Sequence, residues 1–324
     1  MSVHHAGGED LPPQVHARKA TWFELFFDLV FVVAVAQLSG RYAHHFDLAG
    51  AAGSALLLMA MWWCWLGHTF HATRFDQQRP DQRWLGLAQI GAVCVIAYGV
   101  SDAFGERAAG FALGLAAFKA LLVLAYQAER RWRGAHGLIA AYSGLYGLQA
   151  LLWAVSAGLP PTPRLVLWGL ALALDLASPW WVARYTAAVP PHPEHLPERF
   201  GLFTIILLGE GVASVVHALD HGPVLHGTAV VAALLGAALA FLTWLGYFEV
   251  TRAHDERVVH GTAGGRQLRL WAYGHVPIYL GVFSLAAGTV AMAGDDAWGA
   301  PQWALYGGGV ALIALGLALL RRAR

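Results

Sequence analysis

The stretch ELFFDLVFV, residues 24–32, begins an apolar run that continues to residue 42. A helix needs about 20 mostly apolar residues to cross the hydrocarbon core of a bilayer, so the run 21–42 is long enough to span it. Glu24 and Asp28 lie inside this run, four residues apart and therefore on one helix face. The stretch predicts a membrane-spanning helix that carries a pair of carboxylates.

Apolar runs of similar length recur along the whole chain. Of the 324 residues, 57% are hydrophobic and 13% are charged, whereas soluble proteins carry about 25% charged residues. We therefore expect an all-α polytopic bundle rather than a soluble protein. About ten spans are predicted, near residues 21–42, 47–70, 84–101, 108–127, 135–157, 164–187, 199–219, 227–250, 269–292 and 301–320.

The basic residues predict the orientation of these spans, because cytoplasmic loops are enriched in Lys and Arg. With the N-terminus inside, 17 of the 21 Lys and Arg fall on the cytoplasmic side, Arg199 among them, three fall outside, and Lys119 lies within a span. We expect both termini in the cytoplasm. The chain then divides into a polar N-terminal segment (1–20, which does not resemble a cleavable signal), one transmembrane domain (21–320) and a basic tail (321–324).

Short matches suggest an internal duplication. FELF at 23–26 is echoed by FGLF at 200–203, and WLG at 65–67 by WLG at 244–246, with offsets of 177 and 179 residues. Parallel repeats of this kind occur in transporters, which would make 21–130 and 198–320 the two repeats. Such matches also arise by chance in apolar sequence, so both interpretations stay open.

Ionisable side chains inside spans cost about 2.5–3.5 kcal/mol each on insertion scales, and they usually face the bundle interior at functional sites. Six are candidates for binding protons, a cation or a substrate: Glu24, Asp28, Lys119, Asp175, Glu210 and His275. Two acids as close as Glu24 and Asp28 could share a proton or a cation, with His275 meeting them as a relay. Alternatively, Glu24 caps its helix, and Lys119 forms a structural ion pair with Asp175 or Glu210.

Metal, cofactor and nucleic-acid binding have weaker support. Cys64, His68 and His71 share a helix face and are weak candidates for a soft metal. No glycine-rich phosphate loop or nucleophile elbow occurs, so we expect no cofactor. The nearby tryptophans 62, 63 and 65 are interpreted as interface anchors or packing residues. The expected partners are the lipid bilayer and protons or a small cation; no nucleic-acid partner is expected, and the oligomeric state is open.

Several of these motifs resemble one family. ELFFDLVFV at 24–32 and ERFGLFTIILLGE at 198–210 are similar to two signatures of the bacterial low temperature requirement protein A family. Residues 65–76, 247–248 and 273–275 are similar to further family positions. The resemblance implies a multi-pass bacterial inner-membrane protein linked by name to growth in the cold. Glu24, Asp28 and Glu210 fall within its motifs, Asp175 and Lys119 match none, and no substrate is implied.

Three functions fit these observations. The first is a gradient-driven transporter or ion-conducting protein whose carboxylates bind protons or a cation. The second is a membrane enzyme acting on a lipid or isoprenoid, which requires an apolar cavity with carboxylates at its end. The third is a sensory or structural protein whose polar residues serve packing. The first assumes that Asp28 and Glu210 converge in the bundle interior.

Overall fold

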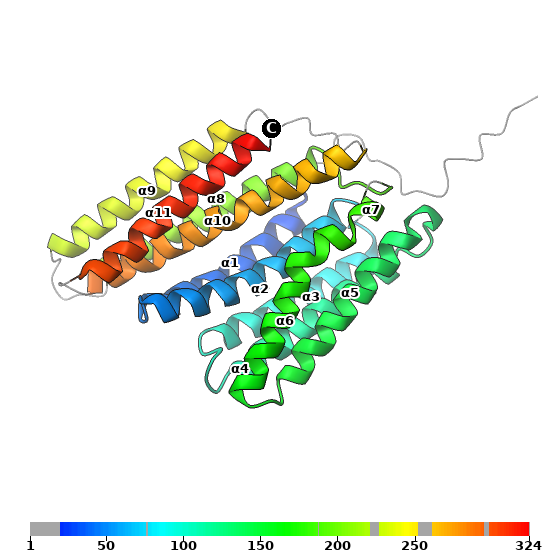
Figure 1. Ribbon diagram of the computed structural model, residues 1–324, viewed down its shortest axis with the longest axis horizontal. Helices are drawn as coiled ribbons and strands as arrows, with labels where there is room; N and C mark the ends of the chain where they lie inside the picture. The colour runs from blue at the N-terminus through cyan, green and yellow to red at the C-terminus, as the bar shows by residue number, and fades with distance from the viewer. Residues whose placement is uncertain are drawn as a thin grey trace, which may run out of the picture.

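The computed structural model describes residues 20–75, 77–186, 188–220, 227–251, 261–294 and 298–323, and within these ranges every regular element is helical (Figure 1). The predicted positions 1–19, Asp76 and Arg324 lie outside the described residues. The α-helices are α1 (Trp22–Ala43), α2 (Leu48–Ala72), α3 (Pro80–Val100), α4 (Ala108–Gln127), α5 (His136–Ser156), α6 (Pro161–Trp181), α7 (Ala183–Thr186), α8 (His195–Asp220), α9 (Gly227–Thr251), α10 (Gly261–Gly294) and α11 (Ala300–Arg322). A single 3₁₀ turn (Arg133–Ala135) precedes α5.

The ten long helices correspond to the ten predicted stretches, with differences of up to eight residues at their ends; α3, for example, begins at Pro80, four residues before the predicted start. The sixth stretch was expected to continue to residue 187, but α6 ends at Trp181 and the short α7 follows, two residues after the helix-disfavouring Pro179. Helix α8 begins four residues before the predicted start, at His195. Helix α10 begins eight residues early and has 34 residues, so it is about 51 Å long.

Eight of the described helices are long and apolar enough to cross a membrane by length and composition: α1 to α5 and α9 to α11. Helices α6 and α8 are not among them; α6 carries the buried Asp175, and α8 the buried Arg199. The chain is therefore a helical membrane bundle with at least eight segments suited to spanning.

Helices α1 and α2 lie between two groups of helices (Figure 1). On one side α3 packs on α1, and α4 and α6 pack on α2; on the other side α8 and α10 contact both α1 and α2. The beginning of α1 and the end of α11 lie at the same end of the bundle (Figure 1). Side chains of the two central helices can therefore join the two groups.

Glycines let α10 and α11 approach closely. A Cβ atom on Gly281 would lie 2.5 Å from the backbone oxygen of Gly309, and one on Gly316 would lie 2.4 Å from Ile278 Cγ1. Gly274 and Gly288 lie seven residues to either side of Gly281, and a Cβ on either would also lie less than 3.0 Å from a neighbouring side chain. Small residues at such spacing are typical of membrane helix interfaces, where packing rather than the hydrophobic effect drives association.

The substitution Gly281→Ala tests this contact. We expect it to lower the free energy of unfolding by about 1–3 kcal/mol, because the new methyl group would overpack against the backbone of α11. Gly307→Ala is the matched control, since its Cβ would meet nothing within 4 Å. Thermal melting in detergent would measure both variants; a Gly281→Ala protein that melts with the wild type would contradict the tight interface.

Candidate functional site

Helix α1 begins with a capping box. Thr21 is the N-cap, and its hydroxyl accepts a hydrogen bond from the Glu24 backbone N–H at 3.3 Å. In return, the Thr21 backbone N–H donates to Glu24 Oε2 at 2.7 Å. This exchange satisfies donors that the first helical turn leaves free. The capping role considered for Glu24 is therefore present, and it occupies one carboxylate oxygen.

The other oxygen of Glu24 faces α8. Glu24 Oε1 lies 3.2 Å from His195 Nε2 and 3.4 Å from an Arg199 terminal nitrogen. The side chains of all three residues are fully buried. Glu24 thus links the beginning of α1 to the beginning of α8 as well as capping its own helix.

Asp28, one turn further along α1, is held more tightly. Arg199 donates to both of its oxygens, from Nε at 3.1 Å and from a terminal nitrogen at 2.6 Å. Trp65 Nε1 on α2 donates to the Asp28 carboxylate at 2.7 Å. Such a two-pronged guanidinium–carboxylate pair fixes both distance and orientation. Glu24, Asp28, His195 and Arg199 are named here the α1–α8 cluster.

An acidic residue beside the α1–α8 cluster, Glu198, reaches the surface. Glu198, whose side chain is 37% exposed, lies 3.6 Å from His195 Nδ1 and accepts a hydrogen bond from the Ala20 backbone N–H at 2.9 Å. His195 therefore lies between an accessible carboxylate and the buried Glu24. Because an imidazole can take a proton on one nitrogen and release it from the other, this order suits proton transfer from the surface inward.

Sequence reasoning missed His195, Arg199 and the role of Trp65. Arg199 was interpreted as a cytoplasmic loop residue and Trp65 as an interface anchor or packing residue, yet both side chains are fully buried against Asp28. A usable signal was present: Glu198 and Arg199 open the motif at 198–210, as Glu24 and Asp28 open the motif at 24–32. An arginine near the start of one motif and two carboxylates near the start of the other predict contact between those starts.

A second buried ion pair lies in the other group of helices. Lys119 Nζ on α4 contacts Asp175 Oδ1 on α6 at 2.7 Å, and Gln149 Nε2 on α5 donates to the same oxygen at 2.8 Å. The three side chains come from three helices and are buried. The structure therefore contains the ion pair between Lys119 and Asp175 that was considered as an alternative.

The region that carries these charged groups matches a known protein family. The family model described as bacterial low temperature requirement A protein (LtrA) matches residues 19–324, a range that includes both buried ion pairs. The chain belongs to the LtrA family. It is also 30% identical over 285 residues to the uncharacterized protein RA0937 of Rhizobium meliloti (strain 1021), covering 83% of this chain and 68% of that protein. No solved structure matches the chain.

Glu210 lies apart from the α1–α8 cluster in this LtrA protein. It follows Arg199 by eleven residues on α8, which is about 16 Å along the helix axis. Glu210 is partly buried, and its carboxylate accepts a hydrogen bond from Ser214 at 3.5 Å. The expected convergence of Asp28 and Glu210 is therefore not found, because each has its own neighbours.

His275 is also engaged elsewhere. Its Nε2 lies 3.0 Å from the Tyr247 hydroxyl on α9, and its Nδ1 lies 2.8 Å from the Trp271 backbone oxygen. His195 occupies the place beside Glu24 that was expected for His275. The sequence pattern indicated a histidine–carboxylate contact in this LtrA chain, and the structure forms it with a different histidine.

The weak metal candidates have separate partners. His68 Nδ1 lies 2.7 Å from Gln89 Oε1, and His71 Nδ1 lies 3.2 Å from Gln77 Nε2. Cys64 is buried as a free thiol. Among the described residues, no three His, Cys, Asp or Glu side chains are grouped as metal ligands. His68 and His71 therefore do not share a hydrogen-bond partner in the structure.

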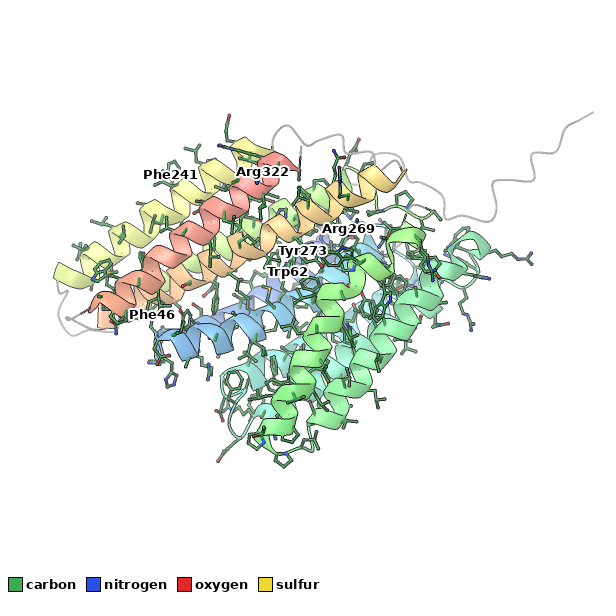
Figure 2. The ribbon with its side chains drawn as sticks, viewed as in Figure 1. Phe46, Trp62, Phe241, Arg269, Tyr273 and Arg322 are labelled. Carbon is green, nitrogen blue, oxygen red and sulfur yellow. The ribbon has the colours of Figure 1, made fainter. Side chains whose placement is uncertain are left out.

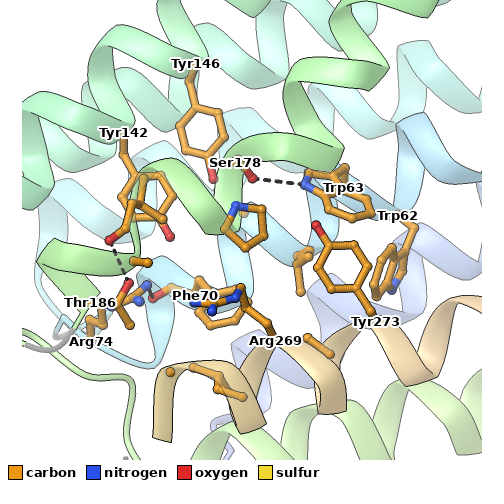
Figure 3. Close-up of a pocket in the computed structure, with 18 residues that line it drawn as sticks. Trp62, Trp63, Phe70, Arg74, Tyr142, Tyr146, Ser178, Thr186, Arg269 and Tyr273 are labelled. Carbon is orange, nitrogen blue, oxygen red and sulfur yellow. Dashed lines mark hydrogen bonds between the residues drawn. The ribbon is translucent and has the colours of Figure 1, made fainter. Parts of the chain in front are cut away.

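A separate cavity opens between α2, α5, α6, α7 and α10. Trp62, Tyr273 and Arg269 lie where α10 faces α2 and α6 (Figure 2). The cavity is partly open and encloses about 670 Å³, including its mouth. Its described lining is mainly aromatic and aliphatic, contains two arginines and contains no acidic residue (Figure 3). The α1–α8 cluster does not line it.

Proposed function

We propose that this LtrA protein is a gradient-driven, proton- or cation-coupled transporter or ion-conducting protein, with the α1–α8 cluster as its ion-binding centre. The observation that carries the proposal is the order of groups from the surface inward: Glu198, His195, Glu24, Arg199 and Asp28. Buried ionisable groups in membrane proteins are costly and mark ion pathways by default. The substrate class stays open.

In the proposed mechanism, proton binding changes how α1 is held to α8. With Asp28 ionised, its two contacts with Arg199 hold the two helices together. A proton on Asp28 removes one charge of the pair, so the attraction weakens and Arg199 can turn towards Glu24. Because α1 lies in the central layer and α8 in an outer group, this switch would favour a different arrangement of the two groups.

We further propose the ten-span topology with both termini in the cytoplasm of a bacterial inner membrane. Helices α6 and α8 would span despite their charges, because Asp175 and Arg199 are neutralised inside the bundle. Support comes from the distribution of Lys and Arg in the sequence. The common side on which α1 begins and α11 ends also requires an even number of crossings (Figure 1).

The proposed duplication has structural support in the pattern of neighbours. Helix α1 packs on α2 and α3, and both of these contact α4; likewise α8 packs on α9 and α10, and both contact α11. These two sets fall in the predicted repeats 21–130 and 198–320. On this view, the α1–α8 cluster joins the first helices of the two repeats.

A lipid- or isoprenoid-modifying enzyme has less support. That function calls for an apolar cavity with carboxylates at its end. The apolar cavity is present, but Glu24 and Asp28 are not among its lining residues. A molecule bound in this cavity would have no carboxylate of the described lining beside it to act as a general acid or base.

The variant Asp28→Asn tests the transport proposal. In proteoliposomes on a solid-supported membrane, wild-type protein is expected to give currents after a pH jump with some member of a panel of inorganic cations, amino acids and organic anions. Asp28→Asn is expected to reduce them to the level of protein-free liposomes, because the introduced amide would neither bind a proton nor pair with Arg199 as an ion. Trp65 can still donate to the amide oxygen, and Glu24 still faces Arg199, which favours folding.

The matched control is Asp81→Asn, the same chemical change at an exposed carboxylate that pairs with Arg79. It should leave the currents unchanged. If Asp28→Asn, with a wild-type elution profile in size-exclusion chromatography, gave wild-type currents, the α1–α8 cluster would not be the ion-binding centre.

A further inference from the structure

One arginine of the cavity is buried with no acidic partner among the described residues. Arg74 is 7% exposed, and its Nε and one terminal nitrogen donate to the backbone oxygens of Val189 and Phe70, both at 2.9 Å. Its other terminal nitrogen, Nη2, is buried and makes no hydrogen bond of normal geometry to a described residue, although the Tyr126 hydroxyl lies close enough to interact with the guanidinium. The guanidinium also lies over the rings of Phe70 and Tyr142, at 5.1 and 5.7 Å.

A second arginine lines the same cavity. Arg269 is on α10, one turn before Tyr273, and is partly buried. No salt bridge joins it to another residue in the part of the chain that the structure describes. Figure 3 shows Arg269 and Arg74 along the same edge of the cavity. Two positive charges therefore lie at one end of a space whose described lining has no negative charge.

The rest of the lining is suited to an apolar chain. Trp62, Trp63 and Tyr146 supply broad aromatic surfaces. Two polar groups there have partners: the Tyr273 hydroxyl donates to the Leu176 backbone oxygen, and the Ser178 hydroxyl accepts from Trp63 Nε1 at 3.5 Å. Trp62 Nε1 has no hydrogen-bond partner among the described residues.

These features together suit a ligand with two parts, an anionic group and an alkyl chain. A buried guanidinium without a counter-ion is unfavourable, because buried charges normally need a paired charge or full hydrogen bonding. A phosphate or carboxylate at the arginine end would supply both the charge and the acceptor that Arg74 Nη2 lacks. An alkyl chain would fill the aromatic end. We propose that this cavity binds an anionic amphiphile, with its headgroup on Arg74 and Arg269 and its tail along α2 and α10.

The proposed site is independent of the transport proposal, because the α1–α8 cluster does not line the cavity. Two sources could supply the same chemistry: an anionic phospholipid of the membrane, or a free amphiphile such as a fatty acid. Both present one anionic group above an alkyl chain. Phosphatidylcholine with the same chains is the matched comparison, since its headgroup has no net charge.

Native mass spectrometry of the full-length protein, released from a neutral detergent, would test the site. The probes are phosphatidylglycerol, phosphatidylcholine with the same chains, and oleate. We expect phosphatidylglycerol to bind about tenfold more tightly than phosphatidylcholine, because both lipids carry a phosphate but the choline ammonium would add a positive charge beside the two arginines. Arg269→Gln should weaken phosphatidylglycerol binding by about tenfold, because a hydrogen bond to a charged group is worth about one order of magnitude in affinity or more.

Arg74→Lys is the second variant, because it keeps the buried charge but removes the second terminal nitrogen. Arg133→Gln, at an exposed arginine, is the control and should bind as the wild type does. Tighter binding of oleate than of phosphatidylglycerol would identify a free amphiphile as the ligand, and the reverse order a membrane phospholipid. Equal binding of phosphatidylglycerol and phosphatidylcholine, or wild-type binding by both Arg269→Gln and Arg74→Lys, would overturn the proposal.

Discussion

Replacing Arg199 with alanine is expected to lower the free energy of unfolding by about 3–5 kcal/mol, the usual cost of removing one partner from a buried ion pair. The change would leave Asp28 and Glu24 buried in α1 without the cation that contacts both. His195 and Trp65 would remain, but neither carries a fixed positive charge. Thermal melting in detergent, followed by intrinsic fluorescence, would measure the loss.

A double-mutant cycle separates the ion pair from other effects of the substitution. The variant that combines Asp28→Asn with Arg199→Gln should be more stable than the sum of the two single changes predicts, by about 0.5–3 kcal/mol, because neither partner is left charged. Arg133→Ala, at an exposed arginine, controls for the loss of a guanidinium in general. Additive effects in the cycle would show that Asp28 and Arg199 do not stabilise each other.

Lys119→Met is expected to have a destabilising effect of similar size, about 3–5 kcal/mol. Methionine is similar in length to lysine, so packing is largely kept while Asp175 loses its cation and retains only Gln149 on α5. The loss of stability in Lys119→Met should therefore reflect the lost electrostatic attraction between Lys119 and Asp175. The melting temperature of the purified protein in detergent is the measurement.

Adding Asp175→Leu to Lys119→Met should restore most of the lost stability, since apolar replacements of a whole buried pair are often neutral or stabilising. The pair lies apart from the α1–α8 cluster, in helices α4 and α6. If the stable double variant also kept its pH-driven currents, Lys119 and Asp175 would be structural residues. A Lys119→Met protein as stable as the wild type would contradict the predicted effect.

The helices could be predicted well because apolar length is a local property of the sequence. Helix α4 spans Ala108–Gln127, the range predicted, and the short segment 102–107, which contains Asp102, Glu106 and Arg107, separates α3 from α4. Helix α10 was predicted less well: its first eight residues, 261–268, include Arg266 and Gln267 and give no apolar signal. A helix that continues outside the hydrocarbon core cannot be delimited by apolarity alone.

The site could be predicted only in part, because ion pairing depends on partners that are distant in the sequence. Glu24 and Asp28 are conspicuous inside an apolar run, and the structure places both in a buried cluster. Arg199 is at the boundary of its run, where an arginine is ordinarily a topology determinant. Its burial follows from the contact of α1 with α8, which neither run specifies alone. The choice of His195 rather than His275 as the neighbour of Glu24 likewise depends on which helices pack together, and the sequence of one run does not specify this.

The separation of 171 residues between Asp28 and Arg199 has a consequence for biogenesis. At ribosomal speeds of about 5–20 residues per second, α1 leaves the ribosome roughly 10–30 seconds before its counter-ion has been synthesised. During that interval, the carboxylates must be neutralised by protons or remain near water at the insertion machinery. Nascent chains that stop before residue 199 should therefore hold their first segment less firmly in the lipid than the finished protein does.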